Sequence, residues 1–261
     1  MTLVELAVTL GLVGLVGALV AGILLRQNRH YRTQTDRIET QQQLRAAIGV
    51  LPPDLRELDA TDGDIEWMTP TGLEIRAMRW IGFLCAPASF DARSDQVSLT
   101  LARTPFFGLR DIDPADSLLL YFERIAAQRD VWWPAKARSV SSAACSNGAA
   151  GLQLTAVLRP GRPANPDGIA VGAPVRGFER ARYRAYQSAA DRQWYLGVQS
   201  PGSPIEPIAG PFVEDGFHLA YVDATGRNTT DSRRVARIDI AVRAPHDSSS
   251  MSVALRNNRR N

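Results

Sequence analysis

The two cysteines are the first residues whose types could do chemistry together. Cys85 and Cys145 lie far apart in the sequence, without a CxxC spacing and without a neighbouring histidine. If the bulk of the chain lies outside the cytoplasm, an even pair of cysteines is typical of a disulfide, worth about 3–4 kcal/mol for a loop of this length. The alternative is two unrelated buried thiols. We predict the Cys85–Cys145 disulfide.

Two short stretches place carboxylates at alternating positions. They are TDGDIEW, with Asp62, Asp64 and Glu66, and RDIDPADS, with Asp111, Asp113 and Asp116. Carboxylate oxygens are the hard ligands that Ca²⁺ prefers, so either stretch could hold the ion. Neither has the full signature of a calcium loop, and we therefore favour solvated turns.

Signs of catalysis are absent from the sequence. The histidines, His30, His218 and His246, are scattered without metal-ligand spacing, and no GxSxG, HExxH, phosphate-loop or dinucleotide motif occurs. We expect a protein that is not an enzyme and that has no cofactor and no metal site.

A run of arginines could bind DNA or an acidic partner. RGFERARYRAY carries Arg176, Arg180, Arg182 and Arg184 with interleaved aromatic residues. On a strand, the last three would share one face, and a solvated outer face is the interpretation we favour. The formal net charge of only +3 is also too small to argue for nucleic acid as a partner.

The N-terminal stretch combines an apolar run with one carboxylate. From Leu6 to Leu25 only Thr9 is polar, and about 20 residues at about 1.5 Å each span roughly the 30 Å of a bilayer core. Residues 1–25 are therefore predicted to form a transmembrane helix. An ionised Glu5 inside such a helix would cost up to about 3 kcal/mol, so this residue requires a partner.

The residues Thr2-Leu3-Val4-Glu5-Leu6 before an apolar helix resemble the mature N-terminus of type IV pilins and type II secretion pseudopilins. In that superfamily a prepilin peptidase removes a basic leader and N-methylates the new first residue, and Glu is the fifth residue. The resemblance implies that Met1 is the processed, methylated residue and that Met1, Thr2, Leu3, Val4 and Glu5 serve assembly. Glu5 would then pair with the α-amino group of Met1 on the same or a neighbouring chain.

The rest of the chain changes from helical to strand periodicity. Residues 26–53 are predicted to continue the helix as an amphipathic half that Pro52-Pro53 stops or kinks. Its apolar stripe comprises Ile38, Leu44, Ile48 and Leu51, and it continues to Leu55 and Leu58. Strands are predicted at 97–102, 117–123, 151–157, 181–189 and 193–200, and a hairpin within 217–244. The last residues are either a frayed tail or an edge strand. The predicted fold class is α+β, a long N-terminal helix packed on a mainly antiparallel β-sheet domain, with residues 54–261 as a periplasmic β-rich domain.

This layout and short phrases such as LPPDLREL resemble the PilW and GspJ group of minor pilins and pseudopilins. The resemblance implies a minor pilin of a type IV pilus that docks in a tip or priming complex and initiates filament assembly. Its partners would be other minor pilins, the major pilin, the prepilin peptidase, the inner-membrane assembly machinery, membrane lipid and a large tip adhesin. Its location would be the inner membrane, single-pass, then the pilus tip at the cell surface. The alternatives are a J-type pseudopilin of type II secretion and a pilus-tip module that binds DNA or displays an adhesin.

Overall fold

A computed structural model describes residues 3–91, 93–114, 116–126, 129–161, 163, 168–245 and 247–255. The elements are α1 (Leu3–Arg56), β1 (Ile65–Thr69), β2 (Gly72–Phe83), β3 (Ser89–Phe90), β4 (Gln96–Ala102), β5 (Phe107–Gly108), β6 (Ser117–Ala126), β7 (Arg129–Ala144), β8 (Ala150–Leu158), β9 (Pro174–Gln187), β10 (Trp194–Gln199), β11 (Glu206–Phe212), β12 (Phe217–Asp223), the 3-10 turn η2 (Ser232–Arg234), β13 (Val235–Ala244) and β14 (Asp247–Ala254).

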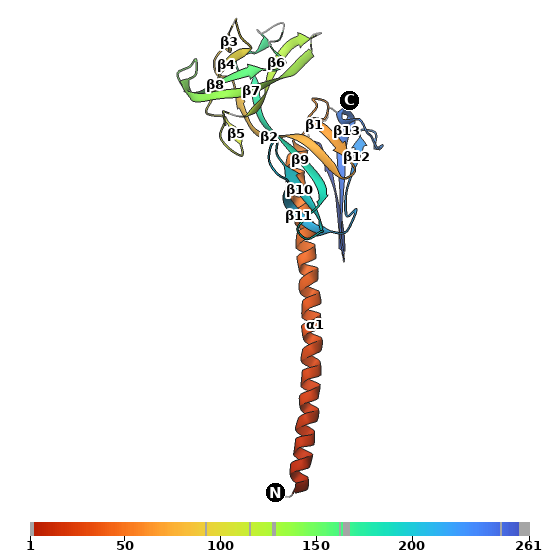
Figure 1. The fold of residues 1–261 in the computed structure, drawn as a ribbon. Helices are drawn as coiled ribbons and strands as arrows, with labels where there is room; N and C mark the ends of the chain where they lie inside the picture. Colours follow the sequence, from red (N-terminus) through yellow and green to blue (C-terminus); the bar gives the residue numbers. More distant parts are fainter. Residues whose placement is uncertain are drawn as a thin grey trace.

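The strands form an 11-stranded sheet and a 3-stranded sheet, both antiparallel. The larger sheet has the order β1-β2-β9-β6-β7-β8-β4-β3, with β10 and β11 beside β9 and with β5 beside β2. The smaller sheet has the order β12-β13-β14. The long strands β2 and β9 pair from Gly72↔Arg184 to Phe83↔Pro174 and run through two separate hydrophobic cores. The strands and the C-terminal end of α1 together form the head of the molecule. The head is divided into a proximal lobe next to the helix and a distal lobe above it (Figure 1).

The proximal lobe is closed by both sheets and by the end of α1. The two sheets meet where Leu219 of β12 donates its amide to the Pro70 carbonyl at 2.7 Å. The Tyr221 hydroxyl adds a bond of 2.9 Å to the Gly72 carbonyl. On the other side, α1 contacts β11, β13 and β14. Leu51 and Leu55 of the helix are fully buried there, so the helix completes the wall of this core.

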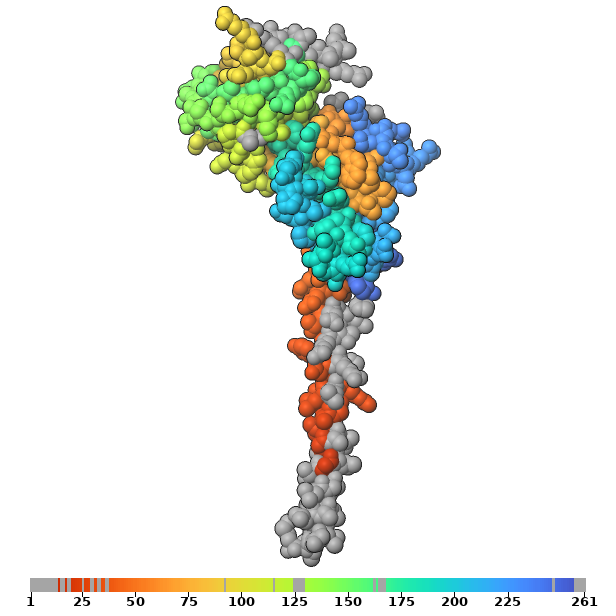
Figure 2. Space-filling model, viewed as in Figure 1, coloured from red at the N-terminus to blue at the C-terminus, as the bar shows by residue number. Residues whose placement is uncertain are grey.

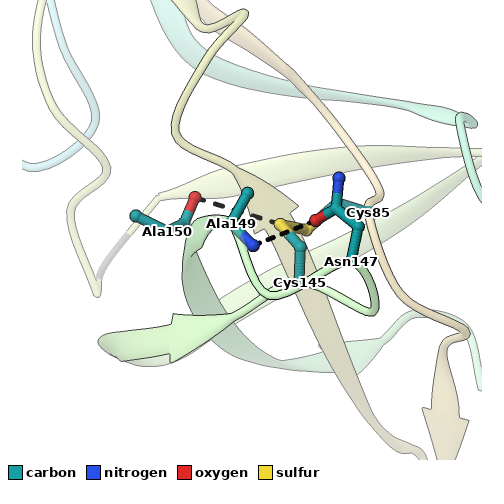
Figure 3. The surroundings of a disulfide bond; sticks show 5 residues. All are labelled: Cys85, Cys145, Asn147, Ala149 and Ala150. Atoms are coloured by element: carbon teal, nitrogen blue, oxygen red, sulfur yellow. Dashed lines mark hydrogen bonds between the residues drawn. A yellow bond between two sulfur atoms is a disulfide. The ribbon is translucent and has the colours of Figure 1, made fainter.

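The distal lobe is made from one sheet that rolls up until it meets its own beginning. Strands β9, β6, β7, β8 and β4 follow one another around the core. Leu84, just after β2, then forms a bridge with Leu101 of β4, and the Cys85 amide donates to the Thr100 carbonyl at 2.9 Å. The Cys85–Cys145 disulfide lies at this seam (Figure 3). The predicted disulfide is confirmed.

Helix α1 belongs to the head only at its C-terminal end. Leu44 is the first of its residues in the proximal core, whereas Ile38 is 55% exposed. Before Leu44 the helix extends away from the head as a stem (Figures 1 and 2). Pro52-Pro53 was predicted to stop or kink the helix, and it does not stop it: α1 continues to Arg56. Prolines this close to a helix end disturb few backbone hydrogen bonds.

The predicted fold class requires correction. Strands dominate the chain, and they build two lobes instead of one sheet domain backed by a helix. The helix packs on the proximal lobe alone. The error arose because we did not predict strands β2 and β7. Both carry tryptophans and charged residues, which obscure the alternation of apolar and polar side chains.

The predicted transmembrane segment over residues 1–25 is also corrected. Within the part of the chain that the structure describes, no helix combines the length and the apolar character required to cross a bilayer. This finding contradicts the predicted single-pass location in the inner membrane.

Candidate functional site

A groove lies where the end of α1, strand β2 and strand β5 come together. It has a volume of about 310 Å³ and is lined by Pro53, Asp54, Glu57, Met78, Arg79, Trp80, Ile81, Phe107, Gly108 and Leu109. The Phe107 and Leu109 side chains are 60% and 79% exposed. Large apolar side chains this exposed and this close together are typical of an interaction surface.

Strand β5 is held in place by its fit against Trp80. Gly108 pairs with Trp80, and a Cβ atom on Gly108 would lie only 2.5 Å from the Trp80 Cβ, so no other residue fits. The Leu109 amide donates to the Arg79 carbonyl at 2.8 Å. These contacts fix the backbone between Phe107 and Leu109 and leave both side chains exposed on the surface.

Trp80 in turn anchors the junction of the two lobes. Its ring is fully buried, and its Nε1 donates to the Asp116 carboxylate at 2.8 Å. Asp116 also accepts hydrogen bonds from the Arg110 guanidinium and, at 2.9 Å, from the Asp113 amide. Burial alone would raise the pKa of Asp116, but these donors outweigh it, and the pKa of this carboxyl lies below its usual value.

The other side of the groove carries acidic groups at the end of α1. Asp54 accepts a hydrogen bond from the Tyr183 hydroxyl at 2.6 Å and forms an ion pair with Arg79 at 3.4 Å. Burial and the neighbouring Asp54 raise the pKa of Tyr183, so this tyrosine stays protonated and keeps donating. Glu57 lines the groove one turn further on. The groove therefore offers apolar contact on one side and, on the other, two carboxylates of which Asp54 is paired with Arg79.

The predicted arginine run has two different environments. Arg180, Arg182 and Arg184 are exposed and alternate with buried Ala181 and Tyr183, as predicted for the outer face of a strand. Arg180 forms an ion pair with Glu66 at 2.7 Å, and Arg182 donates to Glu74 at 2.6 Å. Glu66 also pairs with Arg76, so the two glutamates reduce the positive charge of this face without cancelling it.

Arg176, the first arginine of that run, is buried between the two lobes. It forms an ion pair with Asp64 at 3.4 Å and lies 5.2 Å from the centre of the Trp132 ring. Asp64 belongs to the loop between α1 and β1, and Trp132 belongs to β7 of the distal lobe. This side chain thus connects the lobes, a role that the sequence pattern did not indicate.

The acidic stretches considered for calcium are used in other ways. Asp64 and Glu66 bind different arginines, and Asp116 is held by Trp80 and Arg110. Among the described residues there is no group of three or more His, Cys, Asp or Glu side chains that could hold a metal ion.

The disulfide is supported by a tight turn at the seam. The Ala149 amide donates to the Asn147 side chain at 3.0 Å (Figure 3). The Cys145 amide donates to the Ala149 carbonyl at 2.8 Å. The Cys145 sulfur lies 3.9 Å from the Ala150 carbonyl oxygen, a packing contact because a disulfide sulfur has no proton to donate.

The predicted assembly residues cannot be compared with this groove. Met1 and Thr2 lie outside the described residues, and of Leu3, Val4 and Glu5 only the helical backbone is described. Sequence reasoning missed Phe107 and Leu109. The available signal was the apolar run FFGL inside a polar, proline-containing loop.

Comparison with protein-family models, with curated proteins and with solved structures gives no match.

Proposed function

We propose that the chain is a minor pilin of a type IV pilus, which docks through its helix into a tip or priming complex and initiates filament assembly. One observation carries this proposal. The stem of α1 extends from the head with apolar side chains uncovered: Val20, Ile23 and Leu24 are 49%, 56% and 58% exposed. Apolar side chains exposed together on one helix are typical of a surface that another helix covers.

The head would then select the neighbours. The groove at Phe107 and Leu109 lies at the end of α1, so a subunit that packs beside the helix can reach it. Apolar anchors with a polar surround are typical of protein interfaces. The function we propose is therefore binding and positioning. The stem would pack against the helices of any neighbouring subunit, and the groove would select a particular one.

Deletion of the gene, followed by a count of filaments by electron microscopy, tests the proposal. We expect few filaments, restored by the native chain. Abundant filaments together with lost protein export would instead identify the J-type pseudopilin of type II secretion. The charge pair of Met1 and Glu5 stays a prediction, and complementation with Glu5→Ala in the same strain tests it: restored filament numbers would contradict that role.

The groove is tested by Leu109→Arg, with Val171→Arg as the matched control. Both residues are exposed apolar side chains of the distal lobe, but Val171 does not line the groove. Each change should alter the free energy of unfolding by less than about 0.5 kcal/mol, because neither side chain is buried. We expect Leu109→Arg to reduce filament numbers about tenfold and Val171→Arg to leave them unchanged. Equal numbers for both variants would exclude the groove as a docking site.

A further inference from the structure

Strands β1, β2, β9 and β10 lie side by side in the proximal lobe and present two different faces. On the inner face, Leu73 and Tyr183 are buried in the proximal core. On the outer face, Arg184 is exposed. Strand pairing places Arg184 opposite Gly72 of β2 on one side and opposite Gly197 of β10 on the other. This arginine therefore lies between two positions that carry no side chain.

Each of the two glycines beside Arg184 makes room for an aromatic ring. A Cβ atom on Gly72 would lie 2.9 Å from Cζ3 of Trp67, and a Cβ atom on Gly197 would lie 2.7 Å from Cε1 of Tyr186. Trp67 is also 40% exposed, so part of its apolar surface is open to a ligand. Arg184 thus stands between two aromatic side chains on an open sheet face.

Arg184 differs from its neighbours on β9 in that its charge has no partner among the described residues. Arg180 and Arg182 each form an ion pair with a glutamate. The Arg184 guanidinium forms neither an ion pair nor a side-chain hydrogen bond with any residue that the structure describes. A guanidinium is planar and presents parallel N–H donors, which match the two oxygens of a carboxylate. Arg184 can therefore bind a carboxylate from outside the chain.

A polar hollow lies beside Arg184 on the same face. It has a volume of about 280 Å³ and is lined by Glu74, Arg180, Arg182, Gln199, Ser200, Pro201 and Gly202. Within the described part of the chain, neither Oε1 of Glu74 nor the amide oxygen of Gln199 accepts a hydrogen bond. The hollow therefore offers acceptors as well as the donors of its arginines.

This combination of groups distinguishes between classes of anionic ligand. A nucleic-acid backbone carries a charge at every phosphate and offers acceptors only, so Glu74 would repel it. An extended peptide adds to a free strand edge, but here both edges of β9 are paired, with β2 and with β10. A sugar that carries a carboxylate fits each group. Its carboxylate matches Arg184, its hydroxyls can donate to Glu74 and Gln199, and its C–H groups can pack against Trp67.

We propose that the outer face of β1, β2, β9 and β10 binds an acidic polysaccharide, a polymer of sugars that carry carboxylates. Arg184 binds the carboxylate of one sugar between Trp67 and Tyr186, and the neighbouring sugar of the polymer occupies the hollow beside Arg182. The proposal goes beyond the proposed function and does not depend on it, because the hollow shares no lining residue with the groove at Phe107 or with the stem.

Affinity electrophoresis of the full-length chain in a nonionic detergent tests the proposal. The gel contains polygalacturonate, a carboxylated sugar polymer. Its methyl ester, which has the same rings without the charge, and single-stranded DNA are the comparison ligands. Arg184→Gln removes the unpaired guanidinium. Arg243→Gln is the matched control, because Arg243 is an exposed strand arginine without a side-chain partner among the described residues, but it lies on β13. Both variants lose the same charge, and neither alters a buried side chain.

We expect polygalacturonate to slow the native chain. Its dissociation constant should rise about tenfold for Arg184→Gln and less than about twofold for Arg243→Gln, because only Arg184 makes a charge-assisted contact. Equal effects of the two variants would show attraction by net charge alone and would overturn the proposal, as would no retardation of the native chain or equal binding of the methyl ester. Tighter binding of DNA that Arg184→Gln also weakens would overturn it in favour of a nucleic-acid site.

Discussion

The two lobes share β2 and β9 and yet bury their apolar residues by different means. The proximal lobe covers its part of the large sheet with a second sheet and the end of α1. The distal lobe has no α-helix among its described residues, and its sheet closes on itself. The proximal core therefore depends on contacts between separate layers, and the distal core depends on the seam that joins Leu84 to Leu101.

Because the two cores are separate, a bond within one lobe should stabilise that lobe alone. The disulfide joins the segment after β2 to the turn after β7, both in the distal lobe. In the described part of the chain, strands β2 and β9 and junction residues such as Arg176 connect that lobe to the proximal lobe. Stabilising changes should thus act on one lobe at a time, and hydrogen exchange, which reports local stability, can separate them.

The largest effect should come from Leu51→Ala. Leu51 is fully buried where α1 completes the proximal core, and removing a buried leucine side chain costs about 2–5 kcal/mol. We expect amides of β13 and β14 to lose protection by that free energy while amides of β8 keep theirs. Val50→Ala is the control, because Val50 is 41% exposed. Equal loss of protection in β8 would show that the lobes unfold as one unit.

Removing the disulfide should lower hydrogen-exchange protection in the distal lobe and not in the proximal lobe. The paired change Cys85→Ser with Cys145→Ser opens a loop of 60 residues and should cost about 2–4 kcal/mol. The loss is expected in β4 and β8, at the seam, whereas β13 should be unaffected. Ser146→Ala, a change next to the disulfide that keeps both cysteines, is the control. Lost protection in β13 would contradict the division into two lobes.

The parts of the fold that were predicted are those with a simple period. The apolar stripe from Leu44 to Leu58 lies in the proximal core. In the predicted hairpin, Tyr221 and Leu219 face Ile238 and Ile240 in register. The segment after the hairpin forms strand β14, which is the edge strand that we considered as the alternative to a frayed tail. In these elements a buried face alternates with an exposed one, so the pattern of apolar and polar side chains is sufficient to predict the helix or strand.

The parts that were missed depend on contacts distant in sequence. Trp80 and Arg176 lie on strands whose polar residues are buried at the junction, and their burial is visible only when Asp116 and Asp64 are brought beside them. Ile38 was assigned to the apolar stripe but is exposed, because the head ends at Leu44. Spacing along the helix cannot show where the covering sheet stops.

The smallest and most specific difference between the lobes should appear in their pH dependence. In the distal lobe, the pKa of Asp116 lies below its usual value, so the folded state keeps the carboxylate ionised where the unfolded chain binds a proton. This contribution to stability is present above about pH 4 and is lost on acidification. In the proximal lobe, burial raises the pKa of Asp64 despite the nearby Arg176. Its contribution changes in the opposite direction, and stability falls as the pH rises from about 4 towards the raised value.

Asp116→Asn and Asp64→Asn separate these two contributions. Comparing each variant with the native chain in urea unfolding from about pH 3 to 7 cancels the other carboxyl groups. We expect the destabilisation by Asp116→Asn to be greatest near neutral pH and to shrink on acidification, because the native carboxylate then becomes protonated. For Asp64→Asn, the destabilisation should instead be greatest at low pH, where the native side chain is a neutral acid, and should shrink as the pH rises. If both destabilisations changed with pH in the same direction, the two buried carboxyls would have the same kind of environment, and this contrast between the lobes would be wrong.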